Sequence, residues 1–407
     1  MSQQLLVEYP TTRPPARENP LARGADGVLR YGNLTPALTE LLDLQVHAYA
    51  GREAVVEVGG PRLTYRQLWH SASRIAGGLQ EHGIGYGDRV AIHMPVGARW
   101  VRAFLGALLS GAVPVLVHHG VPDAVAERVI ADSSADFVLR ATGDLPDGAA
   151  YIDDGAALGD LALLCYTSGH LPGGDVVPKG VELTNENLLS AVCSVVDALE
   201  LPGDGLRNLV LLPLAHASGC VDQVLPTFAV GGTVVLAPDA DALAECLAAE
   251  RVDMVSATPS IFARLAPRLA GLSTGGVSRV SIAGHRAEHA AAPRVRGGAA
   301  TALRTVFPAA RQWTVWGATE TSGIGLAADD GAAADAAVLG FPFGGTELAL
   351  YGPRAGAGCG ELLCRGPNVA PRYWNDPQGT ADRFTGGWFH TGDQVTIDPD
   401  GLVRRGE

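Results

Sequence analysis

The chain has almost no lysine. Lysine and arginine together make up 30 of its 407 residues, and Lys179 is the only lysine among them. Basic residues as a whole are outnumbered, because 43 aspartates and glutamates leave a net charge of −13. A protein that binds nucleic acid needs a basic face. The charge balance therefore argues against a nucleic-acid partner, although a nucleotide ligand needs only a few local charges.

Long apolar runs and paired cysteines are also missing. No stretch approaches the ~20 apolar residues of a membrane span, and no basic-then-apolar segment opens the chain as in a signal peptide. We therefore expect no membrane partner. The run 227–238 is instead typical of a buried strand. The six cysteines show no CxxC spacing, so we expect free thiols in a reducing cytoplasm.

Apolar runs alternate with Ala- and Leu-rich stretches from about residue 35 to residue 340. Such runs predict strands buried on both faces, and the stretches between them predict helices. The predicted strands include 89–94, 112–117, 208–212, 232–236, 254–256 and 279–283. One predicted helix begins after Thr184, an N-cap residue with Asn187 three positions further on. We predict an α/β fold over residues 31–340, with two parallel-type sheets and flanking helices.

The two ends of the chain have a different texture. Residues 1–30 contain four prolines among Arg and Glu, which predicts a flexible arm. Residues 341–407 contain short alternating segments separated by Gly, Pro and Asp. This pattern predicts a small β-barrel-like subdomain.

The lone lysine closes a glycine-rich, hydroxyl-containing segment. Thr167, Ser168 and Gly169 open this segment, and Lys179 and Gly180 end it. Glycines let backbone N–H groups approach phosphate oxygens, and a lysine adds a compact charge. The segment therefore predicts a phosphate loop, although an ordinary surface turn is the alternative when it is taken alone.

Three further segments follow in order: 211–219 (LLPLAHASG), 316–323 (WGATETSG) and 387–393 (GWFHTGD). With the phosphate loop, and with 281–284, 340–342 and 371–375, they strongly resemble the adenylate-forming superfamily. This superfamily comprises acyl- and aryl-CoA synthetases, luciferases and adenylation domains of nonribosomal peptide synthetases. The resemblance implies the large N-terminal domain of that fold. It also implies ATP-dependent activation of a small carboxylic acid to an acyl-adenylate, with release of pyrophosphate. Thioester formation on CoA, or on the phosphopantetheine of a carrier protein, normally follows.

The resemblance also assigns roles to the matching residues. Those that would surround the β- and γ-phosphates are Thr167, Ser168, Gly169, Lys179 and Gly180. Thr319 would contact the α-phosphate, and Glu320 would hold Mg²⁺, which prefers oxygen ligands. Trp316, in place of the usual tyrosine, would stack on adenine, with Gly284 and Gly317 beside the nucleotide. Asp393 would accept hydrogen bonds from both ribose hydroxyls. Each polar or aromatic residue has a structural alternative: Trp316 as core, Glu320 as a helix cap, and Asp393 as a turn residue.

The predicted acid pocket combines His216, Ala217 and Gly219 with two residues of a later turn, His285 and Arg286. In relatives that act on α-amino acids, an aspartate at the position of Ala217 pairs with the ammonium group. An ammonium group without a partner is costly to bury. We therefore expect an aryl or acyl acid, for which a catalytic His216 is typical, and Arg286 could meet a second acidic group. The alternative for His216 is a histidine that merely starts a helix, and we expect no role for His118 and His119.

The sequence departs from the family pattern in two places. The phosphate loop 167–180 has fourteen residues, more than the pattern, and His170 and Leu171 replace two hydroxyl residues. The chain reaches the family hinge at residues 401–407. We expect the C-terminal lid domain with its catalytic lysine to be absent from it, since Lys179 is the only lysine. Two other functions therefore stay open: adenylation of a non-carboxylate substrate, and nucleotide binding without catalysis.

Overall fold

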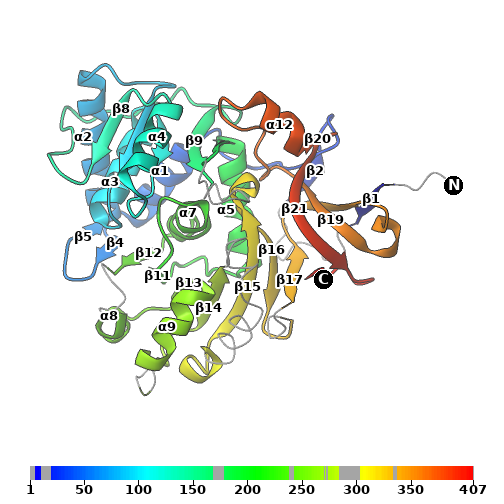
Figure 1. Cartoon of the computed structure of the whole chain (residues 1–407). Helices are drawn as coiled ribbons and strands as arrows, with labels where there is room; N and C mark the ends of the chain where they lie inside the picture. The colour runs from blue at the N-terminus through cyan, green and yellow to red at the C-terminus, as the bar shows by residue number, and fades with distance from the viewer. Residues whose placement is uncertain are drawn as a thin grey trace.

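The computed structural model describes residues 5–10, 20–167, 178–237, 243–269, 271, 274–283, 303–332 and 337–406. It confirms the predicted α/β class. In Figure 1 the lighter-blue and cyan elements gather on one side, and the orange and red C-terminal strands lie on the other, with the dark-blue first strands of the chain beside them. The green and yellow strands run between them.

The N-terminal side contains a five-stranded sheet in the order β10-β9-β7-β6-β8. Strands β8, β6, β7 and β9 are parallel, and β10 runs antiparallel to β9. The strands are β6 (Arg89–His93), β7 (Val113–Leu116), β8 (Phe137–Arg140), β9 (Leu161–Tyr166) and β10 (Gly180–Thr184). The helices of this part of the chain are α1 (Leu38–Tyr49), α2 (Tyr65–Glu81), α3 (Ala98–Leu109), α4 (Asp123–Asp132) and α5 (Asn185–Ala198).

The second sheet has fifteen strands, and its first half is largely parallel. This half contains β4 (Glu53–Glu57), β5 (Arg62–Thr64), β11 (Arg207–Val210), β12 (Thr233–Leu236), β13 (Met254–Ala257), β14 (Arg279–Ala283) and β15 (Arg311–Ala318). Parallel pairing joins β4, β12, β11, β13, β14 and β15 in that order. The helical segments here are α6 (Ala217–Gly219), η1 (Cys220–Val224), α7 (Leu225–Ala229), α8 (Leu243–Ala249) and α9 (Pro259–Leu269).

The second half of that sheet is antiparallel and forms the C-terminal part. Its strands are β16 (Gly323–Asp329), β17 (Val338–Pro342), β18 (Glu347–Tyr351), β19 (Cys359–Arg365), β20 (Phe384–Thr385), β21 (Trp388–Ile397) and β22 (Val403–Arg405). Short helices lie between them: η2 (Thr319–Thr321), η3 (Ala355–Ala357) and α12 (Pro377–Arg383). Strand β17 pairs with β16 on one side and β22 on the other, so the two halves are continuous.

The N-terminal segment that the sequence predicts as a flexible arm is paired where the structure describes it. Strand β1 (Leu6–Tyr9) adds to the edge of the large sheet beside β18, and β2 (Leu21–Arg23) forms a hairpin with β3 (Leu29–Tyr31). The Tyr9 hydroxyl donates to the Ala355 carbonyl oxygen at 3.0 Å. Composition did not indicate these contacts, because strand addition depends on a partner edge far away in the chain.

Local signals in the sequence explain the helix that follows the predicted phosphate loop. The Thr184 side chain accepts from the Asn187 N–H, and the Asn187 side chain accepts from the Thr184 N–H. This reciprocal capping confirms the predicted start of α5. The predicted strand 232–236 is confirmed as β12, but the longer run is not one strand, because among its described residues 227–237 the beginning belongs to α7. Apolar periodicity alone does not separate a buried helix turn from a buried strand.

Candidate active site

Three of the four motif segments follow the carboxyl ends of strands, and the fourth lies mostly within β21. Residue 167 follows β9, residues 211–219 follow β11, and η2 follows β15. Ligand sites of open α/β sheets form outside the carboxyl ends of parallel strands. The candidate site therefore lies at this edge of the two sheets.

The base of the phosphate loop is held on both sides. The Thr167 N–H donates to the Lys179 carbonyl oxygen at 3.0 Å, and the Lys179 N–H donates to Thr167 Oγ1 at 3.1 Å. On the other side of β10, the Trp374 N–H donates to the Gly180 carbonyl oxygen at 2.7 Å. A Cβ on Gly180 would lie about 3.0 Å from Trp374 Cβ, so glycine permits this close approach. Ser168 and Gly169 lie outside the described residues.

Tyr373 and Asp376 connect the predicted phosphate lysine with the predicted metal-binding glutamate. Lys179 Nζ forms an ion pair with Asp376 Oδ2 at 2.8 Å and lies 4.9 Å from the centre of the Tyr373 ring. The Tyr373 hydroxyl donates to Glu320 Oε1 at 2.6 Å. Burial, and then the Glu320 carboxylate, raise the pKa of Tyr373, so the hydroxyl stays protonated and acts as a donor.

The structure also explains why the sequence did not single out these two residues. Tyr373 lies in 371–375, which supports the family resemblance but received no role, and Asp376 is the residue before a short helix. Neither has a distinctive sequence pattern. Their contacts in the candidate site are with residues 53 and 197 positions away. Only the pairing of segment 371–375 with β10 brings them to the site.

The turn that carries Thr319 and Glu320 is fixed by its neighbours. The Ala370 N–H donates to the Glu320 carbonyl oxygen at 2.8 Å, and the Ser322 hydroxyl donates to the Asn368 carbonyl oxygen at 2.7 Å. Ser322 has a left-handed backbone with φ 56°, which tightens the turn into β16. The Glu320 side chain is thus aimed by backbone contacts on both sides of the motif. It is partly exposed and does not cap a helix of its own.

Glu320 is suited to bind a Mg²⁺ ion whose other ligands are mainly phosphate oxygens. Mg²⁺ prefers oxygen ligands and usually takes one or two carboxylates, with phosphates and water completing its shell. In the part of the chain that the structure describes, no group of three His, Cys, Asp or Glu side chains could hold a metal on its own. A single partly exposed carboxylate is compatible with a Mg²⁺ ion that is held mainly by nucleotide phosphates.

Trp316 and Asp393 lie against each other, across β15 and β21. The indole Nε1–H donates to Asp393 Oδ2 at 3.2 Å. The Trp316 side chain is only 2% exposed and packs among Leu326, Leu339 and Val395. In this structure the ring is part of the core, which is the alternative that the sequence left open. A ring so enclosed reaches an adenine only after neighbouring side chains move. Gly317 follows it, and a Cβ there would overlap the Gly323 carbonyl oxygen.

The predicted acid pocket begins at α6. His216 is the N-cap residue of α6, and its carbonyl oxygen accepts from the Gly219 and Cys220 N–H groups. Ala217 is buried, and a Cβ on Gly219 would overlap the Pro213 carbonyl oxygen. Because residue 217 is an alanine, its side chain is a methyl group and offers no partner for a substrate ammonium group. Residues Gly284, His285 and Arg286 lie outside the described residues.

His118, for which we expected no role, contacts the pocket. Its ring stacks on the ring of His216, with the ring centres 4.9 Å apart and an angle of 28° between the planes. His118 Nδ1 accepts from the Gly120 N–H at 3.0 Å. Its position just beyond the carboxyl end of β7 was the available signal, because this end of the sheet faces the site.

A buried carboxyl group lies beneath the site. Asp222, in the π-helical turn η1, accepts from the Ile324 N–H at 3.0 Å. Burial raises the pKa of Asp222 well above its usual range. A Cβ on Gly323 would collide with this carboxyl group, so glycine is required for η1 and β16 to approach. Short π-helical turns often occur near functional sites.

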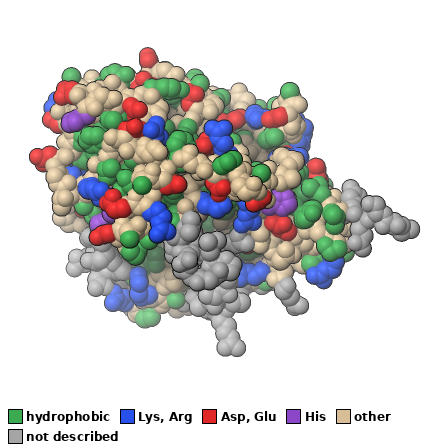
Figure 2. All heavy atoms as spheres, turned by 45° about the horizontal axis from the view of Figure 1, so that its top comes forward, with side chains coloured by type: hydrophobic (Ala, Val, Ile, Leu, Met, Phe, Trp, Pro, Cys, Tyr) green, Lys and Arg blue, Asp and Glu red, His purple; other side chains and the backbone are tan. Residues whose placement is uncertain are grey.

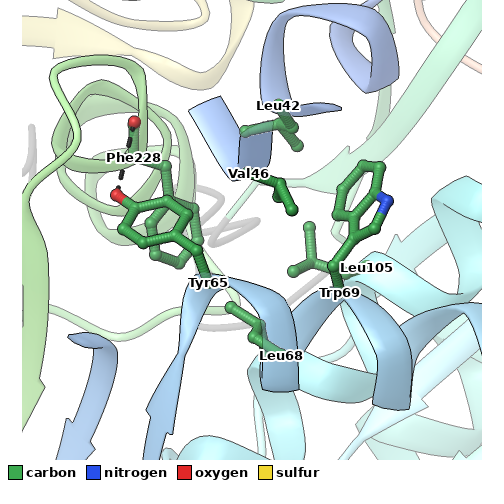
Figure 3. A pocket seen from close by; sticks show the side chains of 7 residues that line it. All are labelled: Leu42, Val46, Tyr65, Leu68, Trp69, Leu105 and Phe228. Atoms are coloured by element: carbon green, nitrogen blue, oxygen red, sulfur yellow. Dashed lines mark hydrogen bonds between the residues drawn. The ribbon is translucent and has the colours of Figure 1, made fainter. Parts of the chain in front are cut away.

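One apolar pocket lies apart from this cluster. Figure 3 shows it between α1, α2, α3 and α7, lined by Leu42, Val46, Tyr65, Leu68, Trp69, Leu105 and Phe228. The Tyr65 hydroxyl donates to the carbonyl oxygens of Gly232 at 2.7 Å and Phe228 at 3.5 Å. The lining offers no carboxylate, amine or imidazole. The pocket therefore lacks the groups that phosphate or acid chemistry needs.

Surface and membrane features add little to the site. On the face in Figure 2, basic and acidic side chains are interspersed. Among the described helices, none has both the length and the apolar character needed to cross a bilayer.

All six cysteines are free, as predicted, and burial raises the pKa of Cys165 to about 12. A backbone hydrogen bond from Ala217 partly offsets that effect, which places the end of β9 beside the predicted acid pocket.

Comparisons with known proteins agree with this geometry. The sequence model of the family described as AMP-binding enzyme matches residues 42–374. Feruloyl-CoA synthase of Amycolatopsis sp is 31% identical, over 85% of this chain and 73% of its own length. A long-chain-fatty-acid–CoA ligase of Mycobacterium tuberculosis is 29% identical, over 84% of this chain and 72% of its own length.

Solved structures show the same fold. The N-terminal domain of FACL13 from Mycobacterium tuberculosis has a TM-score of 0.79 and 25% identity, and the match covers 92% of this chain and all of that one. A putative long-chain-fatty-acid CoA ligase from Rhodopseudomonas palustris has a TM-score of 0.80 and 24% identity, with 91% and 98% covered. The fold is therefore that of the N-terminal part of an adenylate-forming ligase. The chain belongs to the AMP-binding enzyme family, and with it to the AMP-forming acid–thiol ligases.

Proposed function

We propose that this chain activates an aryl or acyl carboxylic acid with ATP, rather than an α-amino acid. The acid attacks the α-phosphate, and pyrophosphate leaves as the acyl-adenylate forms. The observation that carries the proposal is the convergence at one edge of the sheets. There, Tyr373 connects Lys179 with Glu320, and Trp316 contacts Asp393.

Each polar group has a task that its surroundings support. The Lys179 ammonium group would neutralise charge on the β- and γ-phosphates, and Thr319 would donate to the α-phosphate. The Asp393 carboxylate would accept from the ribose hydroxyls, since an ionised carboxylate accepts several hydrogen bonds. Glu320 would hold Mg²⁺, which when bound neutralises phosphate charge in the transition state. Ser168, Gly169 and Gly180 would add backbone contacts to phosphate.

The pocket residues support the substrate class. His216 and Ala217 meet the acid where an α-amino acid would need a carboxylate partner for its ammonium group, and Ala217 provides none. The related proteins include a feruloyl-CoA synthase and a long-chain-fatty-acid–CoA ligase. We therefore propose an aromatic or aliphatic acid, with CoA as the thiol acceptor and a carrier protein as the alternative. The free thiols suit a cytoplasmic setting.

The test is ATP–pyrophosphate exchange across aromatic, fatty, short-chain and amino acids. Exchange should appear with one acid class, excluding amino acids, and should fall in Lys179→Ala and Asp393→Ala. Binding of ATP and AMP to the same chain is measured in parallel. Nucleotide binding then remains detectable even if the exchange reaction is slow. ATP binding without exchange for any acid would leave the non-carboxylate and binding-only alternatives. Exchange with amino acids alone would contradict the argument from Ala217.

A further inference from the structure

Lys179, the only lysine of the chain, is held by two residues to which the sequence assigned no role. Lys179 Nζ donates to Asp376 Oδ2 at 2.8 Å, and the centre of the Tyr373 ring lies 4.9 Å from the same nitrogen. The side chains of Lys179 and Asp376 are 38% and 34% exposed. The ion pair is thus open to water on one side, and a ligand with more negative charge can reach it.

The position of the Asp376 carboxylate is set by its own hydrogen bonds. Asp376 is the N-cap residue of α12, and its Oδ1 accepts from the Gly379 N–H at 2.8 Å. The other oxygen, Oδ2, faces the lysine. The Thr380 hydroxyl donates to the Asp376 carbonyl oxygen at 2.8 Å and accepts from the Tyr373 N–H at 3.0 Å. The carboxylate and the ring beneath the ammonium group therefore belong to one rigid turn.

Gly379 leaves the space into which the ammonium group fits. A Cβ at this position would lie closer than 3.0 Å to both Asp376 Oδ2 and Lys179 Nζ. Either atom would have to move if any other residue stood here. Asp376, Gly379 and Tyr373 together form a notch around the end of the lysine side chain, and we call it the lysine notch.

We propose that Asp376 and Gly379 position Lys179 by holding its ammonium group in the lysine notch when no nucleotide is bound, and that the ATP triphosphate competes with Asp376 for it. This inference rests on the proposed function, because it takes Lys179 as the phosphate-binding lysine. The β- and γ-phosphates carry more charge than one carboxylate and attract the ammonium group more strongly. AMP lacks both phosphates and leaves Lys179 in the notch.

The first experiment uses the single lysine as its own reporter. Protein grown with ¹³C,¹⁵N-lysine gives the side-chain signals of one residue. In the nucleotide-free wild type, the ring of Tyr373 should shift the ε-methylene protons upfield. Asp376→Asn keeps an N-cap residue, and Gly379→Ala places a good helix former in α12, so both variants should fold. Both should move the signal to the position of an exposed lysine. Gly356→Ala is the control, because its Cβ meets nothing within 4 Å.

The second experiment measures competition directly. ATP added to the wild type should move the lysine signal away from its notch position, and AMP should not. Asp376→Asn should tighten ATP binding by about two- to fivefold, the range of a partly exposed ion pair, and leave AMP binding unchanged. In a Lys179→Met background the same substitution should have no effect on ATP binding.

Three outcomes would overturn the inference. The first is an exposed-lysine signal in the wild type, and the second is a signal that neither variant moves. The third is ATP binding that is unchanged or weaker in Asp376→Asn. Failure of the proposed function looks different. In that case neither ATP nor AMP binds, while the nucleotide-free signal and its response to Gly379→Ala still show whether the notch holds the lysine.

Discussion

Trp316→Phe should weaken the hold on the ribose of ATP without a general loss of nucleotide binding. The substitution keeps an aromatic ring in the core, but it removes the Nε1–H donor to Asp393 Oδ2 together with part of the indole volume, and the control below accounts for that lost volume. The buried indole is one donor to this carboxylate. Without it, the carboxylate is less firmly oriented toward the two hydroxyls that we expect it to bind.

The magnitude follows from the geometry. A hydrogen bond to a charged group contributes about 1.5–3 kcal/mol. This one is 3.2 Å long, and its acceptor is partly exposed, so we take about 1 kcal/mol. Since 1.4 kcal/mol is a factor of ten, the Kd for ATP should rise about fivefold. The Kd for 2′,3′-dideoxy-ATP, which lacks both hydroxyls, should change by less than about twofold.

Isothermal titration calorimetry of both nucleotides with the full chain decides the matter. The control is Trp313→Phe, since Trp313 lies on the same strand and is equally buried at 2% exposure. It should leave both Kd values unchanged. An equal loss for ATP and dideoxy-ATP in Trp316→Phe would refute the reasoning, because it would mean that the ring acts by stacking on adenine or by general packing.

Three further predictions concern other parts of the site. Tyr373→Phe removes a buried donor to Glu320, so it should weaken MgATP by about fivefold and metal-free ATP much less; equal losses in titrations with and without Mg²⁺ would contradict it. The pKa of Asp222 is raised, so its folded form resists ionisation and stability should fall as pH rises above the unfolded value. The Tm of Asp222→Asn minus the Tm of the wild type should therefore be larger at pH 8.5 than at pH 5. An equal Tm difference at both pH values would argue against this. Gly317→Ala should lower the free energy of unfolding by about 3 kcal/mol or more, because its Cβ overlaps backbone, while Gly356→Ala should leave the denaturation midpoint unchanged.

The sequence predicted those parts of the fold that depend on local pattern. Strand β14 (Arg279–Ala283) and the cap at Thr184 were found where apolar runs and capping residues indicated them. Such features depend on residues within a few positions of one another, and a single sequence contains that information.

Features that depend on distant partners could not be predicted. Nothing near Tyr373 indicates that its hydroxyl would meet Glu320, and nothing near Asp376 indicates a lysine partner 197 positions earlier. The stacking of His118 on His216 is also a tertiary contact. Family resemblance named the residues that we expect to contact a nucleotide. The residues that orient them became visible only when the pairing of 371–375 with β10 was known.

Strand β17 has a consequence for how the chain responds to force and heat. The predicted boundary between residues 340 and 341 falls inside this strand, which shares its hydrogen bonds between β16 and β22. The C-terminal strands are therefore connected to the rest of the sheet by continuous backbone hydrogen bonding through β17. The two halves should therefore unfold in one cooperative transition. Two separate chains divided at that boundary would each expose a strand edge with unpaired backbone N–H and C=O groups.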